Sequence, residues 1–275
     1  MRIPKISVLM PNYNCERYIR KAIESILEQT YEDFELIIVD DCSTDGSWQI
    51  IQEYVKKDSR VRAYKNEKNQ GIPKTRNRAV SLANGEYLAQ MDSDDISFKD
   101  RFEKQMALFL ENDVVGSDIV LIDQNDRKVG TREYCFNSIG RVILKESPLA
   151  NPTTIFKREL IDKYGNYDEN CSFGEDYDLW LRFYSKGAKF SGVSEVLYYY
   201  RQHSGQSKYT RTKETLRKTI YVKLKSKKKY GLKFGVGDWC RLICEFVLLA
   251  LVPKRLILLL FYLQNNSKKR VESND

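Results

Sequence analysis

The chain is poor in residues and patterns that several large protein classes depend on. Among its 275 residues there is a single histidine, His203, which argues against a Ser-His-Asp hydrolase or a zinc site built from several histidines. Its six cysteines form no C-x-x-C pair, so we expect reduced thiols in a cytosolic protein without a signal peptide. Neither G-x-G-x-x-G nor a Walker P-loop is present, which argues against a dinucleotide-binding fold and a nucleotide triphosphatase.

What the chain does contain is typical of one large domain with an appendage. With 42% hydrophobic and 31% charged residues, it can bury a sizeable core. Its net charge of +8 is unevenly distributed: residues 1–207 carry 29 Lys+Arg against 33 Asp+Glu, and residues 208–275 carry 17 against 5. The basic surplus therefore belongs to the C-terminal region and indicates an anionic partner, either a membrane surface or a nucleic acid.

Apolar runs of strand length alternate with stretches of helical periodicity through the first 100 residues. This alternation implies β-α-β units, and hence an α/β fold with a mostly parallel sheet flanked by helices. The early strands are expected at residues 6–11, 34–39, 61–64 and from Tyr87, with helices at about 19–27, 48–57 and 74–83. Further on, a helix is expected at 101–110, strands at 119–123, 128–131 and 196–200, and a helix opening at Gly174.

Each of the first four strands ends in polar residues, as the edge of a nucleotide-binding sheet would. Ligands of open α/β sheets bind beyond the carboxyl ends of the strands, so these residues are expected to meet in one cleft. Tyr13 offers a ring for stacking on a base, Asp41 an acceptor for a pyrimidine N–H, and Arg76 a cation for a phosphate near a helix start. The alternatives are a core aromatic for Tyr13 and a solvated helix face for Arg76.

The most informative strand end is the stretch from Tyr87, a mostly apolar strand that runs into three carboxylates at Asp92, Asp94 and Asp95. Because side chains alternate along a strand, Asp92 and Asp94 are expected to point to the same side and to converge on one cation. Hard oxygen ligands suit Mg²⁺ or Mn²⁺, which would in turn hold a diphosphate. The alternative is an acidic loop that caps a helix beginning near Phe98.

Several linked motifs over about residues 4–205 resemble those of the family 2 glycosyltransferases of the GT-A fold. They are SVLMPNYN (7–14), ILEQTY (26–31), ELIIVDDCSTDG (35–46) and MDSDD (91–95). The resemblance implies a Rossmann-like sheet and an inverting, metal-dependent transferase that uses a nucleotide-sugar, most often a UDP-sugar. It implies that Asp94 is the most direct metal ligand, joined by Asp92. Taken together with the strand ends, the residues expected at the donor nucleotide are Pro11, Tyr13, Asp41, Arg76, Asp92 and Ser93.

The stretch GEDYDLWLR (174–182) is expected to carry the catalytic carboxylate. Inversion needs a base that takes the proton of the acceptor hydroxyl as it attacks the anomeric carbon. The resemblance assigns this role to the second acid of the Glu-Asp pair, Asp176, with Glu175 as the alternative. Asp178 is expected only to face the helix dipole. In some relatives a histidine at the end of the corresponding strand joins the metal, so His203 is a candidate ligand; the alternative is a hydrogen-bonded surface residue.

Residues 208–275 predict a basic, helical region that lies on a membrane. Eleven Lys+Arg and one acid fall in residues 208–233, and apolar runs follow at 242–252 and 256–263. Neither run reaches the roughly 18–20 residues that span a bilayer, so a helix pair in the interface of an anionic membrane fits better. The alternative is a helical hairpin packed on the catalytic domain. No nucleic-acid partner is expected, because the basic run forms no recognisable binding module.

These features together predict a catalytic domain at residues 1–207 and a basic, apolar helical region at 208–275. The nucleotide-sugar half is expected at about 1–96 and the acceptor half at about 97–207. The expected reaction moves a sugar from a UDP-hexose to a saccharide or lipid-linked saccharide, in surface-polysaccharide synthesis at the cytoplasmic face of a bacterial membrane. Two alternatives remain open: a sugar nucleotidyltransferase, which would need a Gly-rich, Arg-bearing first loop, and an inactive nucleotide-sugar-binding scaffold.

Overall fold

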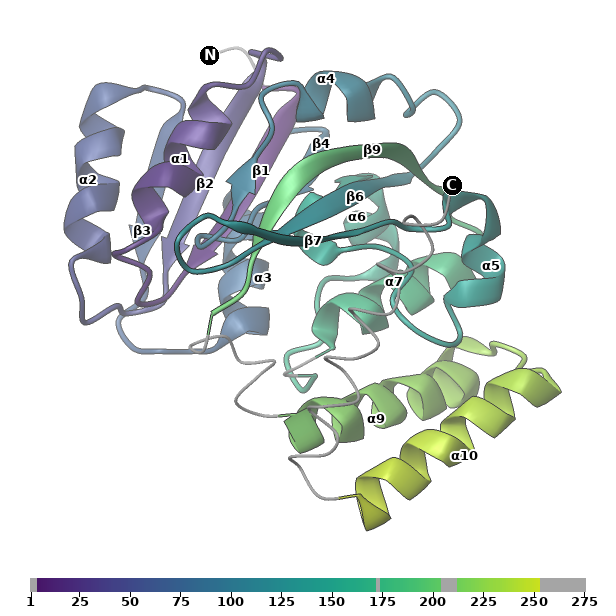
Figure 1. The fold of residues 1–275 in the computed structure, drawn as a ribbon. Coiled ribbons are helices and arrows are strands. Elements are labelled where there is room, and N and C mark those ends of the chain that lie inside the picture. The colour runs from purple at the N-terminus through teal and green to yellow at the C-terminus, as the bar shows by residue number, and fades with distance from the viewer. Residues whose placement is uncertain (1–3, 172–173, 204–211, 253–275) are drawn as a thin grey trace.

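The computed structural model describes residues 4–171, 174–203 and 212–252, and within them a nine-stranded mixed sheet lies at the centre, with helices on both faces (Figure 1). The strand order is β3-β2-β1-β4-β8-β6-β9-β5, with β7 paired to β6. The strands are β1 (Ile6–Asn12), β2 (Phe34–Asp40), β3 (Val61–Lys65), β4 (Tyr87–Gln90), β5 (Ile96–Ser97), β6 (Val114–Ile122), β7 (Lys128–Arg132), β8 (Ile155–Lys157) and β9 (Phe190–Arg201). The helices are α1 (Ile19–Leu27), α2 (Ser47–Lys57), α3 (Ile72–Leu82), α4 (Arg101–Met106), α5 (Ile139–Val142), α6 (Glu159–Tyr164), α7 (Glu175–Ser185), α9 (Thr212–Tyr230) and α10 (Val236–Leu251).

The first half of the sheet consists of four parallel strands, β3, β2, β1 and β4. Alternate residues of each strand enter the two cores: Val8 and Met10 pack with α1 and α2, and Leu9 packs with α3. A strand that is buried on both faces needs apolar residues at every position, which explains the continuous runs in the sequence. The four strands and three helices predicted in this half are confirmed.

The second half of the sheet is mixed. The short strand β8 runs antiparallel between β4 and β6, while β6 and β9 pair in parallel. The strands predicted at 119–123 and 196–200 are the ends of the longer β6 and β9, and the helix predicted at 101–110 ends at Met106. The hydrophobic pattern does not predict most of β6, because Gly116-Ser117-Asp118 is a polar stretch although all three residues are buried. The mostly parallel sheet therefore describes the first four strands and not the second half.

The described part of the basic C-terminal region is a helical hairpin, α9 and α10, in which α9 lies beside α7 (Figure 1). The two helices pack through Leu216, Ile220 and Leu242. Of the two arrangements weighed from the sequence, a hairpin packed on the catalytic domain is what the structure shows for α9. The second apolar run, at 256–263, lies outside the described residues.

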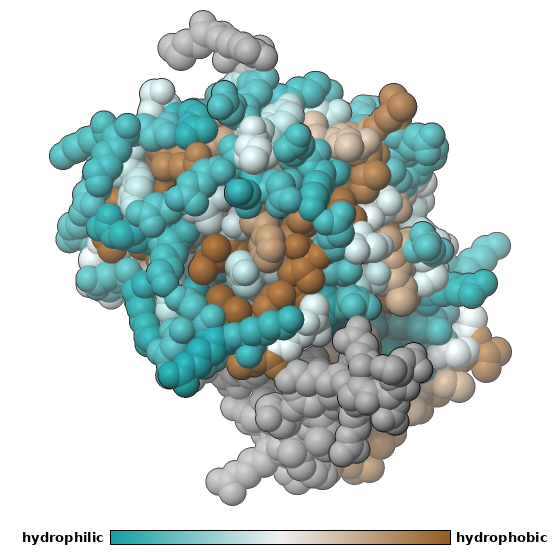
Figure 2. All heavy atoms as spheres, turned by 45° about the horizontal axis from the view of Figure 1, so that its top comes forward, coloured by the Kyte–Doolittle hydropathy of each residue, from teal (hydrophilic) through white to brown (hydrophobic). Residues whose placement is uncertain are grey.

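The outer face of α10 is apolar and open to solvent. Its residues Val236 and Leu251 are 82% and 77% exposed, and Ile243, Phe246 and Val247 are also exposed. In the space-filling view, brown surface at the lower right lies where Figure 1 places α10, and further brown surface shows among teal, hydrophilic side chains in the middle and upper parts of that face (Figure 2). Among the described residues, no helix combines the length and the apolarity that crossing a bilayer requires.

Candidate active site

The acidic stretch after β4 forms a turn. The strand ends at Gln90, so strand alternation does not set the directions of the Asp92 and Asp94 side chains. Asp92 Oδ1 lies 3.1 Å from Arg76 Nη2, and Asp94 Oδ2 lies 2.9 Å from His203 Nε2. The two carboxylates are thus divided between a buried cation on one side and the single histidine on the other.

Asp94 and His203 are the pair best suited to hold a divalent cation. They come from the ends of β4 and β9, 109 positions apart in the chain, and meet at hydrogen-bonding distance. Oxygen and imidazole nitrogen both ligate Mn²⁺, and a metal that also binds substrate phosphates needs only one or two protein ligands. Among the described residues, no group of three or more His, Cys, Asp or Glu side chains is arranged for a metal ion. A metal at this place fits the residues present if the diphosphate completes its coordination.

Arg76 joins the acidic turn to α7. Its guanidinium binds Glu175 Oε1 at 2.7 Å as well as Asp92. With the Asn151 amide turned so that its oxygen faces the guanidinium, that oxygen accepts from Nη1 and Nη2 at 3.1 and 3.0 Å. Although burial alone would lower it, the nearby carboxylates raise the pKa of Arg76. Burial raises the pKa of Glu175 to about 7 against the opposing effect of Arg76. The solvated helix face considered for Arg76 is wrong: the residue is buried within α3, past its first turn.

Two arginines that the sequence did not single out donate hydrogen bonds to the acidic turn and to the strand end before it. Arg201, at the end of β9, donates its backbone N–H to Asp95 Oδ1 at 2.7 Å and its Nε to the Asp94 carbonyl at 2.6 Å. Arg101, fully buried in α4, donates to the Gln90 carbonyl at 2.9 Å. Burial, together with the neighbouring acids Asp94 and then Asp92, raises the pKa of Asp95 well above its ordinary value. Asp95 therefore has a structural role. The only sign of these arginine contacts in the sequence is that single arginines stand beside apolar runs.

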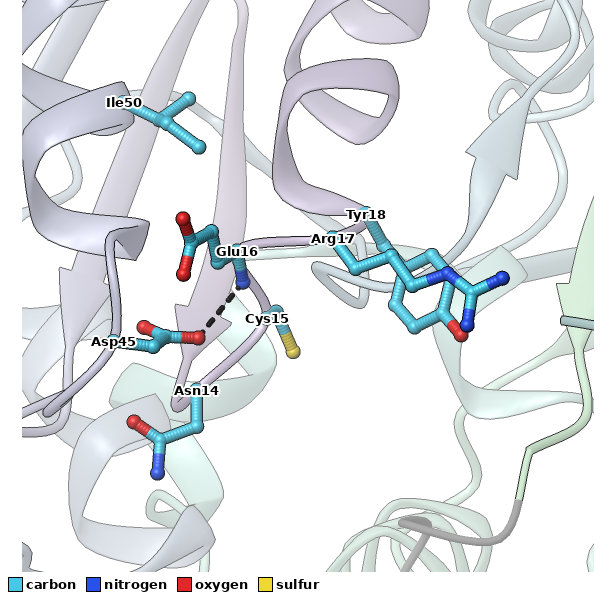
Figure 3. A pocket seen from close by; sticks show the side chains of 7 residues that line it. All are labelled: Asn14, Cys15, Glu16, Arg17, Tyr18, Asp45 and Ile50. Atoms are coloured by element: carbon cyan, nitrogen blue, oxygen red, sulfur yellow. Dashed lines mark hydrogen bonds between the residues drawn. The ribbon is translucent and has the colours of Figure 1, made fainter.

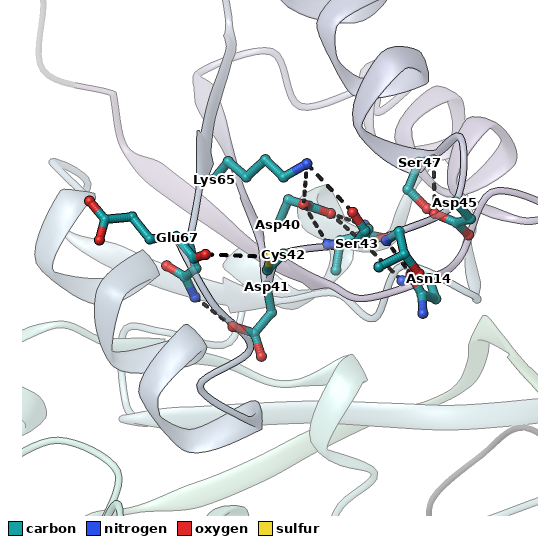
Figure 4. Close-up of polar contacts among 12 residues, drawn as sticks. Asn14, Asp40, Asp41, Cys42, Ser43, Asp45, Ser47, Lys65 and Glu67 are labelled. Carbon is teal, nitrogen blue, oxygen red and sulfur yellow. Dashed lines mark hydrogen bonds and ion pairs between the residues drawn. The ribbon is translucent and has the colours of Figure 1, made fainter.

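The ends of β1 and β2 are joined by a network of short polar contacts (Figure 4). Asn12 Nδ2 donates to Asp40 Oδ1 at 2.7 Å, and the Asn14 backbone N–H donates to Ser43 Oγ at 2.9 Å. Asn14 and Cys42 both adopt positive φ, at 52° and 63°. Such conformations outside glycine are uncommon and cluster at functional sites. The network fixes the turn that follows each strand.

Asp41 lies at the end of β2 with its carboxylate turned toward the segment that precedes α3 (Figure 4). It accepts from Asn66 Nδ2 at 2.7 Å and from the backbone N–H groups of Gln70 and Gly71 at 2.9 and 2.8 Å. A carboxylate has about four acceptor positions, so these bonds leave room for one further donor. The sequence alone gave no indication of this loop-organising role.

Tyr13 is 47% exposed beyond β1, so it is not the core aromatic that was considered as the alternative. Next to it, an open hollow is lined by Asn14, Cys15, Glu16, Arg17, Tyr18, Asp45 and Ile50. Figure 3 shows Glu16 and Asp45 on one side of this hollow and Tyr18 on the other. The Tyr18 ring lies 5.2 Å from that of His203, which connects the hollow to the acidic turn. Pro11 is partly buried in β1 and Ser93 is buried in the turn.

The first turn of α7 presents three acids with different surroundings. Glu175 is buried against Arg76, as described above. Asp176 is partly exposed, and its Oδ1 accepts the backbone N–H of Tyr177 at 2.7 Å. Asp178 is fully buried and accepts the Tyr230 hydroxyl of α9, so the expectation that it only faces the helix dipole is wrong.

Comparison with known proteins places the chain in a defined family. The family model described as glycosyl transferase family 2 matches residues 7–165. An uncharacterized glycosyltransferase of Methanocaldococcus jannaschii is 37% identical over 207 residues, covering 72% of this chain and 71% of that protein. WfaP of Escherichia coli, named as a UDP-Glc:alpha-D-GlcNAc-diphosphoundecaprenol beta-1,3-glucosyltransferase, is 31% identical over 254 residues, covering 88% and 91%.

Solved structures of low identity share the fold. Staphylococcus aureus TarS in complex with UDP has a TM-score of 0.63 at 24% identity, covering 90% of this chain and 81% of that one. A mannosyltransferase from Pyrobaculum calidifontis in complex with GDP-Man and Mn²⁺ has a TM-score of 0.65 at 17% identity, covering 93% and 72%. The predicted GT-A fold is confirmed, and the family match favours a transferase over a nucleotidyltransferase or an inactive scaffold. The chain therefore belongs to glycosyl transferase family 2 and is a glycosyltransferase.

Proposed function

We propose that this glycosyltransferase moves a hexose from a UDP-sugar to a hydroxyl of a saccharide or lipid-linked saccharide, with inversion at the anomeric carbon. The observation that carries the proposal is the convergence of polar groups at one edge of the sheet. The Asp94–His203 pair, the Arg76 ion-pair network and the first turn of α7 come from distant parts of the chain and adjoin one another. Ligands of open α/β sheets bind at this edge.

The nucleotide is proposed to lie at the ends of β1 and β2. Tyr13 supports this, because its exposed ring offers an apolar face on which uracil can stack. Asp41 supports it with a carboxylate that is already oriented by two backbone N–H groups and can accept a pyrimidine N–H. Pro11 and Ser93 are proposed to border the nucleotide from β1 and from the acidic turn.

A divalent cation, Mn²⁺ or Mg²⁺, is proposed to bind at Asp94 and His203, with Asp92 nearby. When bound there, it would neutralise the diphosphate and favour its departure as a leaving group. Asp92 accepts a hydrogen bond from Arg76. It therefore contributes to the site by orienting the Arg76 guanidinium as well as through its own charge. Arg76 is proposed to balance the acids around the diphosphate from its buried position.

Asp176 is proposed as the base. Glu175 is bound to Arg76 and its pKa is raised by burial, whereas Asp176 is partly exposed on the open side of the same turn. In the reaction, the acceptor oxygen attacks the anomeric carbon and its proton passes to the Asp176 carboxylate. The bond from that carbon to the diphosphate oxygen breaks, and the nucleoside diphosphate leaves with the electron pair. One displacement of this kind inverts the anomeric carbon.

The acceptor is proposed to be presented at an anionic membrane surface. The E. coli relative WfaP is named for a diphosphoundecaprenol-linked acceptor. In this chain, α10 exposes an apolar face, and exposed lysines at 227–229 and 233 lie at the adjoining turn of the hairpin. Apolar side chains beside cations are what binds an amphipathic helix to an anionic interface. We therefore propose that the protein is peripheral on the cytoplasmic face of the cell membrane.

Titration calorimetry of UDP tests the donor site. With Mn²⁺ or Mg²⁺ present, UDP is expected to bind, because a cation lets the acidic turn coexist with a diphosphate. Affinity should fall by roughly tenfold or more in EDTA and in Asp94→Ala. Asp100→Ala, which removes an acid paired with Lys104 outside the turn, is the matched control and should bind UDP as the wild type does. The proposal would be contradicted if UDP bound as tightly in EDTA, and to Asp94→Ala, as it binds to the wild type with the metal present.

A further inference from the structure

A lysine of the C-terminal hairpin reaches two carboxylates beside the active site. Lys225 of α9 lies 2.7 Å from Asp168 Oδ2 and 2.6 Å from Asp178 Oδ1. The Lys225 side chain is 9% exposed and that of Asp178 is 0% exposed. Tyr230, at the end of α9, donates its hydroxyl to Asp178 Oδ1 and Oδ2 at 2.9 and 3.0 Å. Contacts that are largely removed from solvent therefore tie α9 to α7.

The two carboxylates bracket the proposed catalytic pair in the chain. Asp168 precedes α7, Asp178 belongs to its first turn, and Glu175 and Asp176 lie between them. One ammonium group thus holds both sides of the segment that carries the two acids. A displacement of Lys225 would therefore loosen the segment both before and after Glu175 and Asp176.

The start of α7 also rests directly on α9. The Asp178 backbone N–H donates to the Gly174 carbonyl at 2.9 Å, the bond that opens the helix. Gly174 has a φ of +113°, and a Cβ placed on it would lie 3.7 Å from Val222 Cγ2 of α9. The backbone at the beginning of α7 is therefore close to α9 as well as bound to it through Asp178.

The ion pairs of Lys225 fix the position of α7 against α9 more than they stabilise the fold. Although burial alone would lower it, the two carboxylates raise the pKa of Lys225, and against its own burial the Lys225 ammonium helps lower the pKa of Asp168 to about 2. Both groups are therefore charged at neutral pH. A buried ion pair gives little net stability compared with apolar groups of the same shape, but it fixes geometry. The hairpin itself is held by a different lysine, Lys223, which lies 2.5 Å from Glu245 of α10.

We propose that Lys225 is a positioning residue of the transfer reaction. By binding Asp168 and Asp178, it sets the position of the first turn of α7, and with it the Asp176 carboxylate relative to Arg76 and the acidic turn. The C-terminal hairpin is then part of the support of the active site, not a detachable membrane anchor. This inference rests on the proposed function of Asp176 as the base.

The test compares four variants of the full-length protein with the wild type. Lys225→Met keeps the apolar stem and removes the ammonium. Because that removes the nearer of two cations from the buried Asp178 and leaves Arg182 Nη2 at 3.7 Å, the double variant Lys225→Met/Asp178→Asn removes both charges of the Lys225–Asp178 pair and keeps a partner for Tyr230. Lys225→Arg restores a cation. Lys223→Met/Glu245→Gln is the matched control, because it removes a buried ion pair that joins α9 to α10 and leaves the bonds of Lys225 to Asp168 and Asp178 in place.

The first readout is amide hydrogen exchange over residues 174–178, which does not depend on activity. Exchange there should rise at least tenfold in Lys225→Met/Asp178→Asn and remain unchanged in the control, with the ends of β1 and β2 unaffected. The second readout is the rate of transfer from a UDP-sugar. Since small misplacements of a catalytic group cost up to about 10²-fold, kcat should fall roughly 10–100-fold at unchanged UDP affinity, and Lys225→Arg should recover most of it.

Unchanged exchange over residues 174–178 in the folded double variant would overturn the inference, whatever the enzyme transfers. So would a kcat within twofold of the wild type, or an equal loss in the Lys223→Met/Glu245→Gln control. Failure of the proposed function has a different signature. In that case the wild type itself would release no UDP from any UDP-sugar, while the exchange result would still report on the contact between α9 and α7.

Discussion

Replacing Arg76 by methionine should be among the most destabilising single changes in the catalytic domain. The guanidinium is buried and binds Asp92 at 3.1 Å and Glu175 at 2.7 Å. Methionine fills much of the volume but leaves Glu175, which is buried, and Asp92, which is 29% exposed, without this cation. Removing one partner of a buried ion pair costs about 3–5 kcal/mol of unfolding free energy. Lys74→Met, an exposed position on the same helix with a 4.0 Å contact to Glu169, should cost about 0–1 kcal/mol.

The loss should depend on pH, and its sign follows from Glu175. Burial raises the folded-state pKa of Glu175 to about 7, above an unfolded value of about 4.3. An acid with a raised folded pKa favours folding while protonated, and that contribution is lost as pH rises from about 4 to 7. Without Arg76 the charged form is costlier still, so Arg76→Met should lose more stability at pH 8.5 than at pH 6.

Urea unfolding followed by tryptophan fluorescence at the two pH values measures both effects. The double variant Arg76→Met/Glu175→Gln should be more stable than the sum of the single changes predicts, by roughly 1–3 kcal/mol, because it leaves one fewer unpaired buried charge. A loss below about 1 kcal/mol in Arg76→Met at both pH values, equal to that of Lys74→Met, would refute the account of this network.

Three further outcomes are expected. Burial raises the pKa of Asp118 to about 6, so the wild type should lose up to about 2–3 kcal/mol relative to Asp118→Asn as pH rises from 4 to 7; parallel urea-unfolding curves would contradict this. Tyr13→Ala should weaken UDP by about 1–3 kcal/mol in calorimetry while Tyr13→Phe binds normally, and equal affinities would exclude stacking. The double variant Ile243→Glu/Val247→Glu should abolish flotation with anionic liposomes, whereas Leu110→Glu, at a 93% exposed apolar position elsewhere, should not; flotation of both variants would exclude α10 as the contact.

The parallel half of the fold could be predicted because burial alone determines which residues its strands contain. Strands such as Phe34–Asp40 are buried on both faces and are therefore apolar at every position. The mixed half could not, since β8 is three residues long and β6 contains a buried polar stretch at 116–118. Nothing local in the sequence marks Ile155–Lys157 as the strand that pairs β4 with β6 in antiparallel fashion.

The candidate site could be predicted as a set of residues but not as a set of contacts. Asp94 and His203 do meet, although they are far apart in sequence. Arg76 was expected at a phosphate and is bound to two acids, because the buried position within α3 is decided by tertiary packing. Asp178 shows the same limit: its partners Lys225 and Tyr230 belong to a helix that the sequence assigned to a separate region.

The most direct test of the central claim is the transfer rate of Asp176→Asn measured beside its UDP affinity. The amide is nearly isosteric, so the variant should fold and bind UDP with Mn²⁺ as the wild type does. Transfer to the acceptor should fall by roughly 10²–10⁴-fold, the usual contribution of a positioned base. Glu175→Gln, measured alongside, should retain more activity than Asp176→Asn. Turnover by Asp176→Asn within a few-fold of the wild type would contradict the assignment, and loss of activity in Glu175→Gln alone would place the base at Glu175.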